Sequence, residues 1–276
     1  MFARTLILAQ SFLFAFSVCS PALAAIFPDK KLEAVVRKYV FAKRDNDQPI
    51  TAEDVRNISV IGGKAQGIAN LEGLQHCRSL AMLDLADNEI VELSALSKLE
   101  RLQFLSLENN NITNLDSLAE LSKLQYLHLG GNKLQELGSL KGLNNLRSLY
   151  LSRNEIENLE PLTNLTKLWS LYLEKNKIQD VKPLKKLVRL SSLDLSDNRV
   201  TDLTPFDEFT ELKYLILSRN QVKDISVLVE MARRDRAGSQ RFAPFINIYL
   251  TDNPLNDEAR DKQLTELRKL VKRVEF

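Results

Sequence analysis

The sequence predicts an α/β solenoid, in which short parallel β-strands line the concave face of an arc, short 3-10 or extended returns form its convex face, and helices cap both ends. Three observations predict this fold class. An asparagine recurs every 22 residues, leucines hold fixed positions around it, and segments with helical apolar spacing lie before and after the repeated region. A unit of this length cannot bury its apolar side alone, so neighbouring units must stack.

The composition is that of an ordered protein with enough apolar residues to form a core. The chain has 276 residues, of which 44% are hydrophobic and 27% are charged. The formal net charge is +2, so no global electrostatic field favours nucleic acid as a partner. Charge alone therefore indicates no class of partner.

Residues 1–24 have the features of a cleavable secretory signal peptide. Arg4 is followed by the apolar stretch LILAQSFLFAFSV, and the segment ends on the small-x-small pattern ALA at 22–24. An uncleaved membrane anchor is the alternative, which the polar and proline residues of the segment disfavour. We expect a secreted or periplasmic protein with no membrane insertion after cleavage. Cys77 would then be the only cysteine, so no internal disulfide is expected.

Residues 25–57 are predicted to form an N-terminal helical cap. The apolar side chains of residues 30–39 fall on one helical face, and Asp29 precedes them as a candidate N-cap. A second helix is indicated by Thr51 and Asp54, which have the spacing of a capping box. These helices would cover the apolar edge that the first repeat otherwise exposes.

Residues 58–255 are predicted to form nine repeat units, with an insertion near 231–243 in the last interval. In the seven regular units leucine occupies the positions eight, five and three before the asparagine, and apolar residues follow two and five after it. The first unit has Gln66 in the asparagine column, and the last has Phe245 and Ile248 in leucine columns. This pattern, L-x-x-L-x-L-x-x-N-x-L, is typical of leucine-rich repeats. The asparagines in register are Asn88, Asn110, Asn132, Asn154, Asn176, Asn198, Asn220 and Asn253.

Asparagine suits the sharp turn by which the chain leaves each buried strand. Backbone N–H and C=O groups point into the core at such a turn, and an unpaired buried group costs about 1–3 kcal/mol. The carboxamide both donates and accepts hydrogen bonds, so it can satisfy these groups in every unit. We therefore interpret this asparagine ladder as structural.

Residues 256–276 are predicted to form a C-terminal helical cap, because Leu264, Leu267 and Val271 fall on one helical face. The insertion before it is basic. We predict that its arginines lie on a solvated loop, and contact with an acidic partner is the alternative. They are Arg233, Arg234, Arg236 and Arg241.

The repeats resemble those of a known family in more than their period. The returns ENLEPL, QDVKPL and TDLTPF are similar to those of internalin-type bacterial leucine-rich repeat proteins, and the entry IFPDKKLEAVV is similar to their N-terminal caps. The resemblance covers about residues 27–255 and implies an exported binding module. The same period occurs in intracellular phosphatase-regulating repeat proteins, so a regulatory subunit acting on an intracellular enzyme is the alternative.

Residues that alternate with the inward leucines point out onto the predicted concave face. Aromatic side chains gather there in the middle of the array, and exposed aromatic clusters are typical anchors of protein interfaces. We predict a binding site for a protein or peptide, with a weaker second group near the C-terminal end. The alternative is that aromatics simply favour strands. The first group is Phe104, Tyr126, His128, Tyr150, Trp169 and Tyr172, and the second is Tyr214, Ile216 and Tyr249.

No pattern in the sequence indicates catalysis, a metal or a cofactor. Cys77 falls in a column that other units fill with Leu or Phe, so it is predicted to be a buried, unreactive thiol. His76 and His128 lie in different units, without a Cys or carboxylate at ligand spacing. No nucleophile has an evident base in reach. We expect a non-catalytic, monomeric binding module without cofactors.

Overall fold

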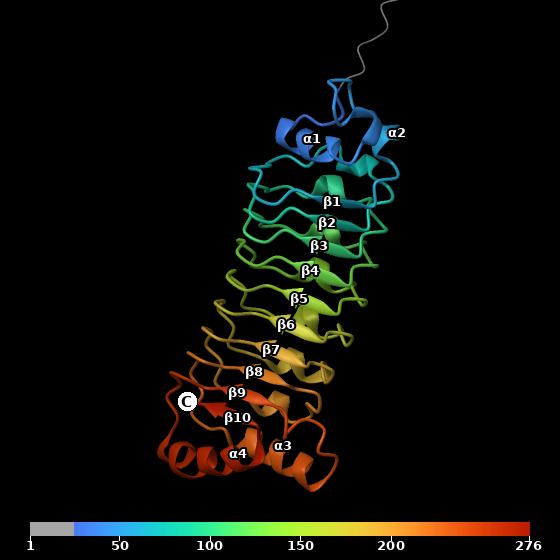
Figure 1. Cartoon of the computed structure of the whole chain (residues 1–276). Helices are drawn as coiled ribbons and strands as arrows, with labels where there is room; N and C mark the ends of the chain where they lie inside the picture. Colours follow the sequence, from blue (N-terminus) through green and yellow to red (C-terminus); the bar gives the residue numbers. More distant parts are fainter. Residues whose placement is uncertain (1–24) are drawn as a thin grey trace, which may run out of the picture.

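A computed structural model describes residues 25–276, and the predicted signal peptide, residues 1–24, lies outside the described residues. Ten parallel strands stack in sequence order into one sheet, and helices close both ends of the solenoid (Figure 1). The predicted fold class is therefore confirmed. The strands are β1 (Val60–Gly62), β2 (Met82–Asp84), β3 (Phe104–Ser106), β4 (Tyr126–His128), β5 (Ser148–Tyr150), β6 (Ser170–Tyr172), β7 (Ser192–Asp194), β8 (Tyr214–Ile216), β9 (Asn247–Tyr249) and β10 (Arg273–Glu275).

The strands pair without offset, so residues 22 apart lie side by side. Leu105 of β3 lies beside Leu127 of β4, for example, and both are fully buried. The chain returns through short 3-10 helices, which stack on the other side of the leucine core (Figure 1). These are η2 (Leu74–His76), η3 (Ser94–Leu96), η4 (Asp116–Leu118), η5 (Gly138–Leu140), η6 (Glu160–Leu162), η7 (Lys182–Lys186) and η8 (Thr204–Phe206).

The ladder asparagines are buried and join consecutive coils by hydrogen bonds. Asn132 donates from Nδ2 to the carbonyl oxygens of Leu107 and Leu129, both at 3.0 Å, and its Oδ1 accepts from the N–H of Ile112 at 3.0 Å. Each asparagine therefore satisfies backbone groups of its own coil and of the coil before it. The same three bonds recur at Asn88, Asn110, Asn154, Asn176, Asn198, Asn220 and Asn253.

The residue before each ladder asparagine adopts a left-handed backbone conformation, which the sequence analysis did not predict. The φ angle is +58° at Asp87, +51° at Asn109, +67° at Gly131 and +56° at Arg153. For a residue other than glycine this conformation costs about 1–2 kcal/mol. The ladder hydrogen bonds offset that cost, because the turn that requires it also aims the backbone groups at the asparagine.

The N-terminal cap begins with helix α1 (Lys30–Arg37). One carboxylate oxygen of Asp29 accepts from the N–H of Lys31 at 2.8 Å, as an N-cap residue does. The other accepts from the N–H of Ala69 at 2.9 Å, in the first return. A single side chain therefore caps the helix and fastens it to the solenoid.

The second half of the cap contains the 3-10 helix η1 (Phe41–Lys43) and helix α2 (Ala52–Val55). The predicted capping box is present, because Thr51 and Asp54 each accept from the other's backbone N–H. Helix α1 ends before Tyr39, which therefore does not extend its apolar face. Instead, the Tyr39 hydroxyl accepts from the N–H of Gly62 at 2.9 Å and covers part of the free edge of β1.

The first part of the basic insertion is helical, so the prediction of a loop was wrong for Arg233, Arg234 and Arg236, whereas Arg241 lies in the loop that follows. Helix α3 (Ser226–Ala237) takes the place that a 3-10 helix occupies in the other coils. Arg233 forms an ion pair with Glu266, and Arg234 forms one with Asp207. These arginines remain exposed, but their ion pairs attach the helix to the flanking coils.

Asp235 organises the loop that follows α3. Its carboxylate accepts from the N–H groups of Arg241 at 2.9 Å, Phe242 at 3.2 Å and Ala243 at 2.9 Å, and from the hydroxyl of Ser239 at 2.9 Å. The residue is only 6% exposed. A buried carboxylate thus closes this turn, where the regular coils use a neutral asparagine.

The C-terminal cap contains a π-helical turn, η9 (Ala259–Gln263), and helix α4 (Leu264–Leu270). The helix ends before Val271, which is extended, so the prediction of a helix through Val271 was wrong. The chain turns back instead, and β10 pairs with β9 at the end of the sheet. This tenth strand follows no repeat pattern, and it removes the free edge that β9 would otherwise expose.

Cys77 is fully buried, and burial raises the pKa of its thiol to about 12. The prediction of a buried, unreactive thiol is confirmed, because the thiolate is the reactive form. Within residues 25–276, none of the helices has the length and apolar character that crossing a membrane requires.

Candidate functional site

Four neighbouring strands, β3 to β6, carry a continuous layer of aromatic rings on the outer face of the sheet, here called the aromatic patch. Its residues are Phe104, Tyr126, His128, Tyr150 and Tyr172. Phe104 and Tyr126 stack with their ring centroids 4.2 Å apart, and Tyr150 and Tyr172 stack at 4.8 Å. Tyr126 and Tyr150 lie 5.2 Å apart and join the two stacks. Such ring pairs stabilise each other by about 0.5–1.5 kcal/mol beyond their buried area.

The strand register assembles the patch. Tyr126 lies beside Phe104, and Tyr150 lies beside both His128 on one side and Tyr172 on the other. The sequence analysis predicted this adjacency from the 22-residue spacing. All five side chains are half-buried, because each ring covers its neighbours.

The phenol groups of the patch remain available for contacts. Within residues 25–276, the hydroxyls of Tyr126, Tyr150 and Tyr172 take part in no hydrogen bond, whereas the hydroxyl of Tyr39 does. Tyrosine hydroxyls in packed surroundings usually have a hydrogen-bond partner. The patch therefore combines apolar rings with polar groups that a ligand or solvent can satisfy.

Burial and nearby acidic groups shift the pKa values of ionisable side chains in the patch. Burial raises the pKa of Tyr126 to about 12, and Tyr150 and Glu108 act in the same direction. Burial lowers the pKa of His128, although Glu108, whose Oε2 lies 3.4 Å from Nδ1, opposes the shift. Burial therefore favours the neutral forms of Tyr126, Tyr150 and His128.

A carboxyl group borders the patch on its C-terminal side. Asp194 of β7 lies beside Tyr172, and burial raises the pKa of this carboxyl group. The hydroxyl of Ser196 donates to it at 2.6 Å, which opposes that shift. The carboxyl group is thus held in place next to the rings. No catalytic partner is evident at this position.

The second predicted group is smaller, and its rings do not stack on one another. Tyr214 and Ile216 lie on β8, and Tyr249 lies beside Ile216 on β9. Tyr214 is 47% exposed. The two tyrosines of this group make no ring contact with each other, so the group lacks the continuous stacking of the aromatic patch.

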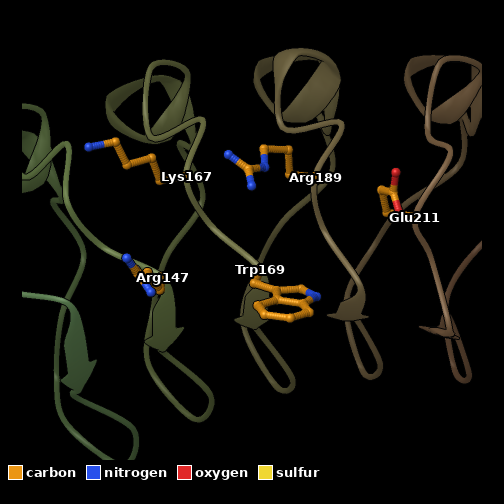
Figure 2. A pocket seen from close by; sticks show the side chains of 5 residues that line it. All are labelled: Arg147, Lys167, Trp169, Arg189 and Glu211. Atoms are coloured by element: carbon orange, nitrogen blue, oxygen red, sulfur yellow. The ribbon is translucent and has the colours of Figure 1, made fainter.

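Trp169 does not join the aromatic patch, although the sequence analysis grouped it with those residues. It lies one residue before β6 and is 59% exposed. Its indole lines a separate hollow, and Figure 2 shows Arg147, Lys167 and Arg189 on the same side of the coils as the indole. This hollow, here called the Trp169 pocket, encloses about 380 Å³ and is lined by Arg147, Lys167, Trp169, Arg189 and Glu211.

The basic residues of this pocket were not predicted, because they lie outside the strands whose alternation places side chains on the concave face. Arg147 and Trp169 occupy the column directly before the strand, and Lys167, Arg189 and Glu211 occupy the column two residues earlier. Both columns keep the 22-residue period. Applying the same period to positions outside the strands would have placed these side chains together.

Within residues 25–276, no group of three or more His, Cys, Asp or Glu side chains is arranged to hold a metal ion. The eight asparagines of the ladder form the hydrogen bonds that the sequence analysis assigned to them and face the core. The ladder asparagines are therefore not available to a ligand, whereas the aromatic patch, the second group and the Trp169 pocket lie at the surface.

Comparison with known proteins supports the same fold. Internalin C2 from Listeria monocytogenes is 28% identical over 90% of this chain and 93% of its own, with a TM-score of 0.64. A leucine-rich repeat protein from Leptospira interrogans is 19% identical over 74% of this chain and 62% of its own, with a TM-score of 0.58. No curated protein matches the chain in sequence.

A plant protein shares the fold as well. The ectodomain of the Arabidopsis thaliana receptor kinase GASSHO1/SCHENGEN3, in complex with CASPARIAN STRIP INTEGRITY FACTOR 2, is 23% identical over 79% of this chain and 26% of its own, with a TM-score of 0.60. The family model described as "Leucine-rich repeat region" matches residues 54–211 of this chain. This match covers more than half of the sequence, so the chain belongs to the leucine-rich repeat family and is structurally similar to the Listeria internalins.

Proposed function

We propose that this protein is an exported, non-catalytic binding module that holds a protein or peptide ligand on the aromatic patch. The observation that carries this proposal is the unbroken contact of rings across β3 to β6. Rigid aromatic side chains contribute most to binding energy at protein interfaces, because they bury a large area at a small entropic cost.

The free tyrosine hydroxyls of the patch favour binding over a purely structural role. Strand propensity accounts for single aromatic residues, but it does not require three neighbouring tyrosines whose hydroxyls lack intramolecular partners. The fold itself can present a ligand, because the Arabidopsis ectodomain was solved in complex with its factor. Export is proposed from the features of residues 1–24.

Affinity capture tests the binding site. Protein that starts at Ala25 would be used beside a Tyr126→Ala/Tyr150→Ala/Tyr172→Ala variant, with extracellular and periplasmic fractions as the source of ligand. We expect the unaltered protein to retain a protein or peptide that this variant loses. A matched variant, Tyr214→Ala/Tyr249→Ala, removes two tyrosines outside the aromatic patch and should retain the ligand.

Circular dichroism would first establish that both variants fold, which half-buried surface positions should allow. A ligand held equally by all three proteins would contradict the assignment to the aromatic patch. A ligand lost only by the Tyr214→Ala/Tyr249→Ala variant would move the site to the second group.

Export has a separate test. The full chain would be expressed in a Gram-negative host, and the N-terminus of the accumulated protein would be sequenced in each cell fraction. We expect a periplasmic or secreted protein that begins near Ala25. An intact Met1 in the cytoplasm would contradict export and would favour the regulatory role on an intracellular enzyme.

A further inference from the structure

The Trp169 pocket gathers positive charges that have no acidic partner. Arg147, Lys167 and Arg189 are all exposed, and within residues 25–276 none of them forms an ion pair. Lys167 makes one hydrogen bond, to the neutral side chain of Asn145 at 2.7 Å. The single acid of the pocket, Glu211, is already paired with Arg241. The pocket therefore has an uncompensated positive charge beside an exposed indole (Figure 2).

The charged surface continues from the pocket toward the N-terminal coils. An adjoining hollow of about 260 Å³ shares Arg147 and Lys167 with the Trp169 pocket and adds Lys123. Its other lining residues include Gln103 and Gln125, which directly precede Phe104 and Tyr126 in the sequence. The basic surface thus runs along the starts of the strands that carry the aromatic patch, and one partner can reach both.

The chemistry of the pocket selects carboxylates. Arginine offers a planar fork of N–H donors that matches a carboxylate group, and clusters of arginine recognise acidic motifs. Trp169 adds an apolar surface on which an aliphatic side chain can pack, or an aromatic one can stack. An acidic segment with an apolar residue between its carboxylates would satisfy both features.

The distribution of charge favours a short segment over a long polyanion. Neither column that lines the pocket is an unbroken row of cations. The column directly before the strands reads Gln103, Gln125, Arg147, Trp169 and Ser191, and the column two residues earlier reads Arg101, Lys123, Asn145, Lys167, Arg189 and Glu211. A polysaccharide or nucleic acid carries charge at every unit and is matched by continuous basic surfaces. The chain as a whole has a formal net charge of only +2, which provides no long-range attraction for such polymers.

We propose that the Trp169 pocket is a second contact site, which binds an acidic peptide segment of the protein partner with its carboxylates on Arg147, Lys167 and Arg189 and an apolar side chain on Trp169. This inference rests on the proposed function for the protein nature of the partner. The partner would therefore carry an acidic segment next to the part of its own surface that contacts the aromatic patch. The aromatic patch would supply affinity, and the pocket would supply charge selectivity.

The pocket can be tested without the partner, because Trp169 is the only tryptophan of the chain and its fluorescence reports on this site alone. The probe is the acetylated peptide Glu-Glu-Leu-Glu-Glu, titrated into protein that starts at Ala25. We expect a saturable change in tryptophan emission that weakens as salt is raised. The peptide Gln-Gln-Leu-Gln-Gln should cause no saturable change, because it lacks the carboxylates.

Two charge-reversal variants make the test specific. Arg147→Glu/Arg189→Glu removes two cations from the pocket and should weaken binding of the acidic peptide by at least about tenfold. Lys141→Glu/Lys185→Glu changes the net charge equally at exposed positions on the 3-10 side and should bind as the unaltered protein does. Circular dichroism would verify that both variants fold.

Several outcomes would overturn the proposal. Equal weakening in the two charge-reversal variants would show a general charge effect and no defined site. A fluorescence change with polygalacturonate but none with the acidic peptide would make the pocket a glycan site. No saturable change with either probe would remove the pocket as a binding site. The Tyr126→Ala/Tyr150→Ala/Tyr172→Ala variant should bind the peptide normally, so failure of the aromatic patch as a ligand site would leave this result unaffected.

Discussion

The middle of the solenoid and its C-terminal end use the same residue types for different purposes. Arg147 and Arg189 in the middle are exposed and, within residues 25–276, form no ion pair, whereas Arg233 and Arg234 of α3 are paired with acids. The turns differ as well, because a neutral asparagine closes each regular coil and the carboxylate of Asp235 closes the insertion. An arginine-rich segment can therefore bind an acidic partner only where the fold leaves its arginines without ion pairs.

The two regions differ because neighbouring coils place acidic side chains within ion-pair distance of the arginines of α3 but not of those in the middle. Asp207 lies 27 residues from Arg234 in sequence, and Glu266 lies 33 residues from Arg233. Helix α3 carries these arginines to the flanking coils, where the acids already lie. In the middle, the coils next to Arg147 and Arg189 present Lys167 and Trp169 to the same hollow.

The largest change in unfolding free energy is expected from a substitution in a regular coil. Asn154→Ala would leave the carbonyl groups of Leu129 and Leu151 and the N–H of Leu134 without their buried partner. We expect the free energy of unfolding to fall by about 3–4 kcal/mol, since each unpaired buried group costs about 1–3 kcal/mol and some will reach water. Urea unfolding followed by circular dichroism measures this change.

Asn144→Ala serves as the matched control, because Asn144 is exposed and its side chain makes no hydrogen bond within residues 25–276. Its unfolding free energy should stay within about 0.5 kcal/mol of the unaltered protein. A similar loss in both variants would show that the asparagine ladder has no special structural role.

A smaller effect is expected at the insertion. Asp235→Asn supplies one acceptor oxygen where the carboxylate uses two, so some of the N–H groups of Arg241, Phe242 and Ala243 lose their acceptor. We expect a loss of about 2–3 kcal/mol, since hydrogen bonds to a charged group contribute about 1.5–3 kcal/mol. Asp257→Asn, at an exposed position, should leave the unfolding free energy unchanged.

The two turns should also differ in their response to pH. Burial alone would raise the pKa of Asp235, but hydrogen bonds from Arg241 and Ala243 outweigh it and hold the pKa below its ordinary value. The unfolded value is about 3.9, so the carboxylate's contribution is complete above about pH 4 and is lost as pH falls through the lower folded-state pKa. The stability difference between the unaltered protein and Asp235→Asn should therefore shrink below pH 4. The loss of unfolding free energy caused by Asn154→Ala should stay constant below pH 4. If that loss also shrank below pH 4, the predicted difference between the two turns would be contradicted.

The smallest effect concerns the arginines themselves. Arg234→Ala removes the ion pair with Asp207 and should lower the unfolding free energy by about 0.5–1 kcal/mol, as exposed ion pairs do. Raising the salt concentration should reduce that loss. Arg189→Ala removes no ion pair within residues 25–276 and should leave the stability unchanged. Equal losses from the two variants would mean that pairing does not distinguish the two regions.

Sequence periodicity predicted most of the fold and part of the candidate site. The strands, the asparagine ladder and the N-cap at Asp29 follow from residue type at fixed spacing. The pairing of Phe104 with Tyr126 follows as well, because strands without offset place residues 22 apart side by side. The separation of Trp169 from these rings did not follow, since one residue before the strand the chain already faces another surface.

The repeating coil followed from the sequence alone, because each regular unit contains the leucines and the asparagine that one turn of the solenoid requires. Only the tertiary structure decided the irregular parts: helix α3 in place of a 3-10 helix, strand β10, and which arginines remain unpaired. The same physical cause explains why the sequence did not predict any of these three features. Edge pairing, loop closure at Asp235 and ion pairing depend on groups that come together from distant coils, and no local pattern of residues records that proximity.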